Sequence, residues 1–200
     1  FAVINPATGE AIAEITAADV GQADRAMESA RQAFNQWREM PTLARGALLL
    51  KLADTLAEHR EELAQLESLC SGKTIMLARM LELDQSVAFL RYFAGWAGKI
   101  TGETLDVSLP SMAGEKYTAF TRRQPLGVVV GIVPWNFSIM IAIWKMAAAM
   151  VCGCTIVLKP SEYTPLTLLR VAELAKAVGI PDGVINVVNG AGGEIAQRLI

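Results

Sequence analysis

The sequence predicts an α/β protein whose carboxyl-terminal part, residues 126–200, folds as a doubly wound parallel sheet. Apolar runs begin at residues 127, 154 and 184, which is roughly the 30-residue spacing of right-handed β-α-β crossover units. The first run, Gly127–Val133, shows no polar alternation, which indicates a strand covered on both faces. Hydrophobic residues make up 52% of the chain and charged residues 19%, so a sizeable core is expected and general disorder is excluded.

The amino-terminal part, residues 1–106, is expected to be mainly helical after two short strands around a turn. Apolar residues spaced three or four apart between Val20 and Trp37 predict a helix with one buried face. Leucines at the same spacing predict a second helix, capped by Thr42, and a third across residues 63–69. A long helix is expected over residues 75–99, with the exposed charges Arg79, Glu82 and Arg91.

The tripeptide Gly72-Lys73-Thr74 resembles the end of a phosphate-binding loop, but the full motif is absent. The glycine that such a loop requires five residues before Gly72 is replaced by Glu67. We therefore interpret the helices of this part as structural.

Residues 107–125 predict a β-hairpin inserted before the first core strand. A turn between Pro110 and Gly114 precedes the segment Tyr117–Arg123, in which polar and apolar residues alternate weakly. Because polar residues occupy both faces, this hairpin has little core to rest on. It is either an oligomerisation arm that pairs with another subunit or a plain surface ribbon.

Two helices are expected to connect the three core strands. The first spans residues 139–151 with Ser138 as its cap, and the second spans Leu166–Val178 with Thr164 as its cap and Pro165 at its start. The second and third strands are expected at residues 154–158 and 184–188. A glycine-rich turn then leads into a further helix.

The charge of the chain indicates which partners are disfavoured, and its cysteine content indicates the cellular compartment. The net charge is −2 and there is no basic block, which disfavours nucleic acid or an anionic membrane as a partner. The uncharged stretch between Arg123 and Lys145 is long enough for a membrane-spanning helix, but Gly131, Pro134 and Asn136 interrupt it, which favours a buried strand followed by a helix. Three cysteines without a disulfide framework indicate a reducing compartment, and we expect a cytoplasmic location.

Residues that can bind a ligand follow each of the three strands. Asn136 is either a loop cap or a donor to a ligand, and Lys159 and Glu162 either hold the hydroxyls of a ribose or form a solvated pair. The Gly190–Gly192 turn precedes a helix, so it either binds phosphate or is simply flexible. Because the carboxyl ends of parallel strands share one edge of a sheet, we infer a nucleotide site there. The usual dinucleotide fingerprint is not met, since its acidic residue should follow the glycines and Glu162 precedes them.

Several motifs occur in an order that resembles the NAD(P)-dependent aldehyde dehydrogenase superfamily. They are Asn5-Pro-Ala-Thr-Gly-Glu10, Phe93-Ala-Gly-Trp-Ala97, Pro134-Trp-Asn-Phe137, Lys159-Pro-Ser-Glu162, Gly179-Ile-Pro-Asp-Gly-Val184, Asn186-Val-Val and Gly190-x-Gly192. The likeness covers essentially all 200 residues and is closest to members that oxidise phenylacetaldehyde. It implies the cofactor-binding portion of that fold, with residues 1–106 and a Rossmann-like core at 126–200 forming the NAD-binding domain and residues 107–125 forming an oligomerisation arm.

The resemblance implies NAD-dependent oxidation of an aldehyde to its acid through a cysteine thiohemiacetal. The nucleophilic cysteine and general-base glutamate of the family belong to segments beyond residue 200, so we expect this segment alone to be inactive. Cys70, Cys152 and Cys154 are not expected to replace the nucleophile, because Cys70 ends a helix and the other two flank Gly153 in the apolar core. The alternatives are a catalytically silent dinucleotide-binding or scaffold homologue and a CoA-acylating relative.

The resemblance also implies roles for individual residues. Asn136 matches the asparagine of the oxyanion hole, and Lys145 matches a lysine that either relays protons or is structural. Glu162 favours NAD over NADP, because a carboxylate repels a 2′-phosphate. The positions that match cofactor contacts are Ile132, Val133, Pro134, Trp135, Lys159, Ser161, Glu162, Gly192, Gly193 and Ala196. The positions that match the substrate tunnel are Phe137, Met140, Ile141 and Trp144, although core packing explains Met140 and Ile141 equally well.

The substrate and partners follow from the same resemblance. Phe137 and Trp144 indicate an aromatic or otherwise apolar aldehyde such as phenylacetaldehyde, and a homodimer or homotetramer is expected. No metal site is expected, because Cys152-Gly-Cys154 has no further ligands nearby. Ser138 stands where the family usually has proline, and the effect should be small because either residue can begin a helix.

Overall fold

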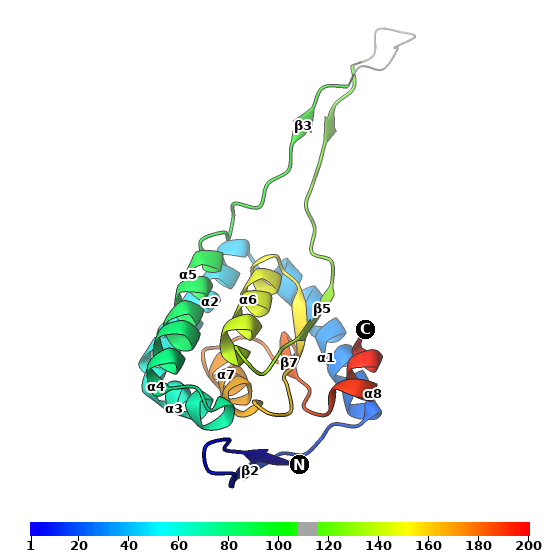
Figure 1. The fold of residues 1–200 in the computed structure, drawn as a ribbon. Coiled ribbons are helices and arrows are strands. Elements are labelled where there is room, and N and C mark those ends of the chain that lie inside the picture. The colour runs from blue at the N-terminus through cyan, green and yellow to red at the C-terminus, as the bar shows by residue number, and fades with distance from the viewer. Residues whose placement is uncertain (108–115) are drawn as a thin grey trace.

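The computed structural model describes residues 1–107 and 116–200. Within these residues a parallel sheet lies at the centre of the molecule (Figure 1), and its strand order is β5 (Val128–Ile132), β6 (Thr155–Lys159), β7 (Ile185–Val187). The predicted parallel sheet is therefore confirmed, and the ends of each strand lie within one residue of the expected positions.

Helices cover both faces of this sheet, as a doubly wound fold requires. On one face, buried residues of α1 (Val20–Glu39) and α8 (Gly192–Leu199) surround Val157 of β6. On the other face, α6 (Ser138–Val151) and α7 (Leu166–Ala177) contribute to the core that contains Ile156 and Leu158. Successive residues of β6 thus enter different cores, which explains why the whole strand is buried.

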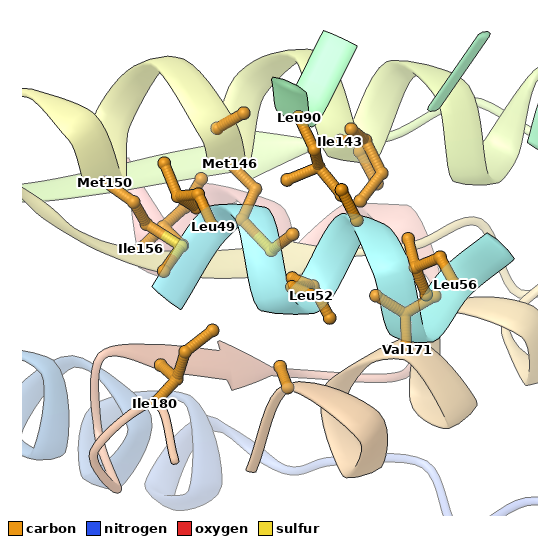
Figure 2. Packing of buried hydrophobic residues seen from close by; sticks show 14 of the residues in the cluster. Leu49, Leu52, Leu56, Leu90, Ile143, Met146, Met150, Ile156, Val171 and Ile180 are labelled. Carbon is orange, nitrogen blue, oxygen red and sulfur yellow. The ribbon is translucent and has the colours of Figure 1, made fainter. Parts of the chain in front are cut away.

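The larger core is built around α2 (Thr42–Glu58), whose leucines lie among residues of α5 (Gln85–Ala94), α6 and α7 (Figure 2). The central side chains are Leu49, Leu52, Leu56, Leu90, Ile143, Met146 and Val171. Gly46 lets α2 approach the segment after α5 closely, since a Cβ at this position would lie only 2.7 Å from the Cβ of Ala97. The periodic leucines of the sequence therefore mark the inner face of α2, as expected.

The long helix expected over residues 75–99 is instead three consecutive segments. They are α4 (Ile75–Leu77), the π-helix η1 (Ala78–Asp84) and α5, which ends at Ala94. The wider i→i+5 turns of a π-helix change the direction in which its side chains point relative to an α-helix. The expectation of an exposed Glu82 was therefore wrong, because this side chain is fully buried.

The expected side-chain caps were also wrong. The residues before α2, α6 and α7 are Pro41, Phe137 and Pro165, and none of them provides a side-chain cap. Thr42 is the first residue of α2, and the hydroxyl of Thr164 is buried without a partner among the described residues. Ser138 is the first residue of α6 and donates its hydroxyl to Glu67 instead of accepting a backbone amide.

The remaining elements lie outside the sheet. An antiparallel pair, β1 (Ala2–Ile4) and β2 (Ala11–Glu14), comes before α1, and α3 (Arg60–Ser71) follows α2. In Figure 1 the strands β3 (Thr104–Leu105) and β4 (Ala119–Phe120) run away from the body of the molecule as an antiparallel arm.

The arm begins slightly earlier than expected. Its pairing starts at Thr104, before the predicted boundary of 107, and the turn predicted between Pro110 and Gly114 lies outside the described residues. The subunit-pairing role of the arm stays a prediction. Among the described residues, no helix is both long and apolar enough to cross a membrane.

Candidate functional site

The segments that follow the three parallel strands leave the sheet at one edge. Ile132 pairs with Lys159, and Leu158 pairs with Val187, so the three strands end level with one another. Two further backbone bonds extend the ladder, from the Val133 amide to the Lys159 carbonyl and from the Val188 amide to the Leu158 carbonyl, each 2.9 Å long. The convergence inferred from the sequence is therefore present in the fold, at the position where open α/β sheets bind ligands.

Asn136 lies in the loop between β5 and α6. Its side chain is exposed and makes no hydrogen bond to any described residue. The backbone carbonyl of Asn136, by contrast, accepts a 2.9 Å hydrogen bond from the ammonium of Lys73. The loop backbone is thus held while the side-chain amide stays available, and Phe137, not Asn136, precedes α6 as its N-cap residue.

The residues around Asn136 differ in how accessible they are. Ile132, Pro134 and Trp135 are exposed, and Trp135 exposes 57% of its surface. Val133 is buried, and its amide is part of the sheet ladder. Three of the four residues matched to the cofactor cleft are therefore accessible to a ligand, whereas Val133 has a structural role in the described part of the chain.

The first turns of α6 present a partly apolar face next to Asn136. Phe137, Met140 and Ile141 are half-buried, and Ile141 packs against the larger core. Trp144 is 38% exposed and lies against Phe89 of α5, with ring centroids 4.9 Å apart. This face can border an apolar substrate, although Ile141 also serves the core.

Lys145 lies in the middle of α6. It is exposed seven residues after the start of α6, a rise of about 10 Å along the helix. Its side chain lies beside β5, where a Cβ at Gly131 would come within 3.4 Å of the Lys145 Cδ atom. Lys145 also borders a hollow of about 810 Å³ between β5, the end of α6 and the base of the arm. The structure thus places Lys145 beside β5 and at the border of this hollow, and its proton-relay role stays a prediction.

Lys159 and Glu162 form a close pair after β6. The Lys159 ammonium is 3.7 Å from the Glu162 carboxylate and donates a 2.9 Å bond to the Pro160 carbonyl. Lys159 is only 3% exposed, and this burial lowers its pKa, an effect that Glu162 opposes. Ser161 is buried and its hydroxyl accepts the amide of Tyr163, so it shapes the turn. The pair can offer an ammonium donor and a partly exposed carboxylate acceptor to a sugar.

The glycine turn after β7 leaves the amino end of α8 open. Ala191 precedes the helix, and no side chain in the described part of the chain caps it. A Cβ built on Gly192 or Gly193 would meet no described atom within 4 Å, so the protein's own packing does not require glycine there. Ala196 is half-buried one turn further on. Uncapped amides and unfilled space at two glycines suit the close approach of a pyrophosphate.

A buried charge cluster beneath the Asn136 loop is the feature that sequence reasoning missed. Lys73 donates to Glu67 at 3.0 Å and also to Glu82 and to the Asn136 carbonyl. Burial and the nearby Glu67 raise the pKa of Glu82. Gly72-Lys73 was noticed only as an incomplete phosphate loop. The true signal, a lysine and two glutamates on three separate segments, has no local pattern in the sequence.

The cysteines do not form a reactive centre in this part of the protein. Burial and Glu67 raise the pKa of Cys70 to about 12, so its thiol stays protonated and inert. Cys154 is buried, but Cys152 is exposed, so its expected place in the core was wrong. Within the described residues all three thiols are free, and no group of three or more His, Cys, Asp or Glu residues could hold a metal ion.

Comparison with known proteins defines the class of this fold and site. The family model described as the aldehyde dehydrogenase family matches residues 1–200. A phenylacetaldehyde dehydrogenase from Pseudomonas fluorescens is 48% identical over 99% of this chain and 40% of its own length. Aldehyde dehydrogenase, cytosolic 1 from Rattus norvegicus is 47% identical over 100% of this chain and 39% of its own length.

Solved structures agree with these matches. An aldehyde dehydrogenase from Bacillus cereus, solved as an NAD+ complex, superposes with a TM-score of 0.94 at 45% identity, over 100% of this chain and 40% of that one. PnpE in complex with nicotinamide adenine dinucleotide superposes with a TM-score of 0.92 at 46% identity, over the same shares of the two chains.

The fold is that of a doubly wound α/β protein. More specifically, the chain belongs to the aldehyde dehydrogenase family. It spans 40% of the length of the phenylacetaldehyde dehydrogenase and of the Bacillus cereus structure.

Proposed function

We propose that the protein containing this chain oxidises an aldehyde to the carboxylic acid with NAD, and that these residues supply the cofactor site and an oxyanion donor. The observation that supports this proposal most strongly is the loop of Asn136. Its amide is exposed and has no partner among the described residues, at the sheet edge shared by Glu162 and Gly192. Membership of the aldehyde dehydrogenase family and the NAD-bound neighbours agree with it.

The proposed work of Asn136 is electrostatic. As a nucleophile adds to an aldehyde, negative charge develops on the carbonyl oxygen, and a donor fixed in advance stabilises that charge more than it stabilises the substrate. The amide of Asn136 is suited to this task because its backbone is held by Lys73 while its side chain is unpaired within the described residues. The nucleophile and general base belong to the part of the protein beyond these residues.

NAD fits the residues at the sheet edge. Lys159 and Glu162 provide a donor and an acceptor for ribose hydroxyls, and the uncapped start of α8 suits a pyrophosphate. The carboxylate of Glu162 disfavours the additional phosphate of NADP. When bound, NAD supplies the acceptor for the hydride that leaves the aldehyde carbon.

The proposed substrate is an apolar or aromatic aldehyde. Phe137, Met140 and Trp144 make the surface beside Asn136, at the start of α6, largely apolar, and the ring of Trp144 lies tilted against that of Phe89. A polar substrate would find few hydrogen-bond partners on this face. The 48% identity with a phenylacetaldehyde dehydrogenase supports phenylacetaldehyde as the first substrate to test.

The test is the Asn136→Ala variant of the full-length protein, assayed for NADH formation from phenylacetaldehyde. We expect kcat to fall by about a hundredfold to a thousandfold, the usual loss of one oxyanion-hole donor, with the Kd for NAD unchanged. Asn35→Ala removes an exposed asparagine from α1, away from the sheet edge, and should leave kcat unchanged.

Three outcomes would contradict the proposal. Full turnover in Asn136→Ala would remove the oxyanion role of this side chain. Absence of NADH formation by the unmodified protein with any apolar aldehyde would favour a silent homologue, and product that is acyl-CoA instead of free acid would favour a CoA-acylating enzyme.

A further inference from the structure

We propose that Lys73, Glu67 and Glu82 form a positioning unit that fixes the loop of Asn136 for its work as an oxyanion donor. This inference rests on the function proposed above and adds three positioning residues to it. The three side chains come from different segments, since Glu67 belongs to α3, Glu82 to η1, and Lys73 to the turn between α3 and α4.

Every donor of the Lys73 ammonium is used within this unit. An ammonium has three N–H donors, and here they reach Glu67 Oε1 at 3.0 Å, Glu82 Oε1, and the carbonyl of Asn136 at 2.9 Å. Lys73 also lies over the ring of Phe137, 5.2 Å from its centroid. One side chain thus holds the backbone of Asn136 and the ring of the next residue.

The two carboxylates that bind Lys73 also hold the first turn of α6. Ser138 donates its hydroxyl to Glu67 Oε1 at 2.6 Å, and the amide of Met140 donates to Glu82 Oε2 at 3.0 Å. With Lys73 on Asn136, contacts are made at positions 136, 138 and 140. The segment that presents the Asn136 amide is therefore held at Asn136 itself and at two residues that follow it.

Local backbone features direct these side chains to the loop. Gly72 ends α3 in the left-handed conformation, with φ of 73°, and so turns the chain at Lys73. The π-helix η1 contains Glu82 and orients it inward. A π-helical turn is frequently found at functional sites.

Stability alone is a poor explanation for this cluster. Glu67 and Glu82 are fully buried, Lys73 is 12% exposed, and two carboxylates share one ammonium. Removing such charges from water costs more than their mutual attraction returns unless the geometry is fully satisfied. Here Glu67 Oε2 has no partner among the described residues. The cluster of Lys73, Glu67 and Glu82 therefore does not stabilise the fold efficiently. Because its hydrogen bonds converge on the Asn136 loop, a role in positioning that loop explains it better.

A double-mutant cycle in the full-length protein separates positioning from general stability. We expect Lys73→Met to lower kcat by about tenfold to a hundredfold, because a small displacement of a catalytic group has that effect, with the Kd for NAD unchanged. In the Asn136→Ala background the same Lys73→Met change should lower kcat by less than about twofold, since it acts through an amide that is no longer there.

Controls account for folding and for loss of charge. Lys176→Met removes an exposed lysine that also pairs with an acid, Asp182 at 3.0 Å, and should change neither kcat nor NAD binding. If Lys73→Met does not fold, Lys73→Met combined with Glu67→Gln removes one charge of each sign and keeps the net charge of the cluster. The cycle is then run with that pair.

The outcomes are distinct from those that test the oxyanion role. If the losses of kcat from Lys73→Met and Asn136→Ala multiply in the double variant, the two residues act independently and the proposed positioning role is wrong. Full kcat in a folded Lys73 variant would have the same meaning. Either result would leave the role of Asn136 intact. If Asn136→Ala itself retained full turnover, the proposed function would fail first, and the positioning unit would have nothing to position.

Discussion

At the scale of single residues, we propose that Glu162 sets the preference for NAD over NADP. Its carboxylate is 3.7 Å from the Lys159 ammonium and 36% exposed, so it can both accept a ribose hydroxyl and repel a phosphate. We expect Glu162→Gln to raise the ratio of kcat/KM for NADP to that for NAD by about tenfold, because it removes a like-charge repulsion near the protein surface.

The measurement is steady-state kinetics of the full-length protein with each cofactor. Glu173→Gln is the matched control, since Glu173 is an exposed glutamate that pairs with Arg170 on α7. An unchanged cofactor ratio in Glu162→Gln would show that this carboxylate does not contact the ribose.

Single residues also show where sequence reasoning failed. Asn136, Lys159 and Glu162 were found because they directly follow apolar runs, and the end of a strand is visible in a short stretch of sequence. Glu82 was predicted on the exposed face of a helix, but its orientation depends on the π-helix, and the spacing of apolar residues does not indicate a π-helix. Ser138 was interpreted as a cap, whereas Glu67, distant in the sequence, binds its hydroxyl.

At the scale of elements, Arg45 joins the ends of two helices. It is 5% exposed and donates to the carbonyls of Trp37 and Arg38 at the end of α1 and to that of Val151 at the end of α6. These carbonyls are among the last four of each helix, which have no partner within the helix. Burial lowers the pKa of Arg45, but several acceptors still surround its charge.

We expect Arg45→Met to lower the free energy of unfolding by about 2–3 kcal/mol, because hydrogen bonds from a charged group are lost and buried carbonyls are left unpaired. Chemical denaturation of the full-length protein measures this change. Arg91→Met, which removes an exposed pair with Asp54, should have a much smaller effect. Equal stability of the two variants would mean that Arg45 does not hold the helix ends together.

Helices and strands were predicted well where the spacing of apolar residues within the element itself determines its type and position. The strands, α1 and α6 were located from apolar runs and spacing, which are local. The caps and the break at η1 were not, because each depends on a partner from elsewhere in the fold. The expected helix over residues 75–99 shows this clearly, since its apolar spacing is helical but its hydrogen bonding changes within it.

At the scale of the whole molecule, the parallel sheet brings the candidate site residues to one edge, and the helical layer holds the Asn136 loop in place there. Three strands ending level with one another bring a carboxylate, an amide and a glycine turn to one edge. The layer formed by α3, η1 and the turn between them reaches that edge from outside the sheet and holds the Asn136 loop. The first arrangement follows from the order of strands, which the sequence reveals, whereas the second follows from packing between distant segments.

The proposed cofactor site is tested most directly by a crystal structure of the full-length protein with NAD bound. We expect the hydroxyls of the adenosine ribose to hydrogen-bond to Glu162 and Lys159, with the pyrophosphate at the amino end of α8. We also expect Lys73 still to donate to the Asn136 carbonyl. NAD bound elsewhere on the protein, or at this edge without contact to Glu162 or α8, would contradict the central claim.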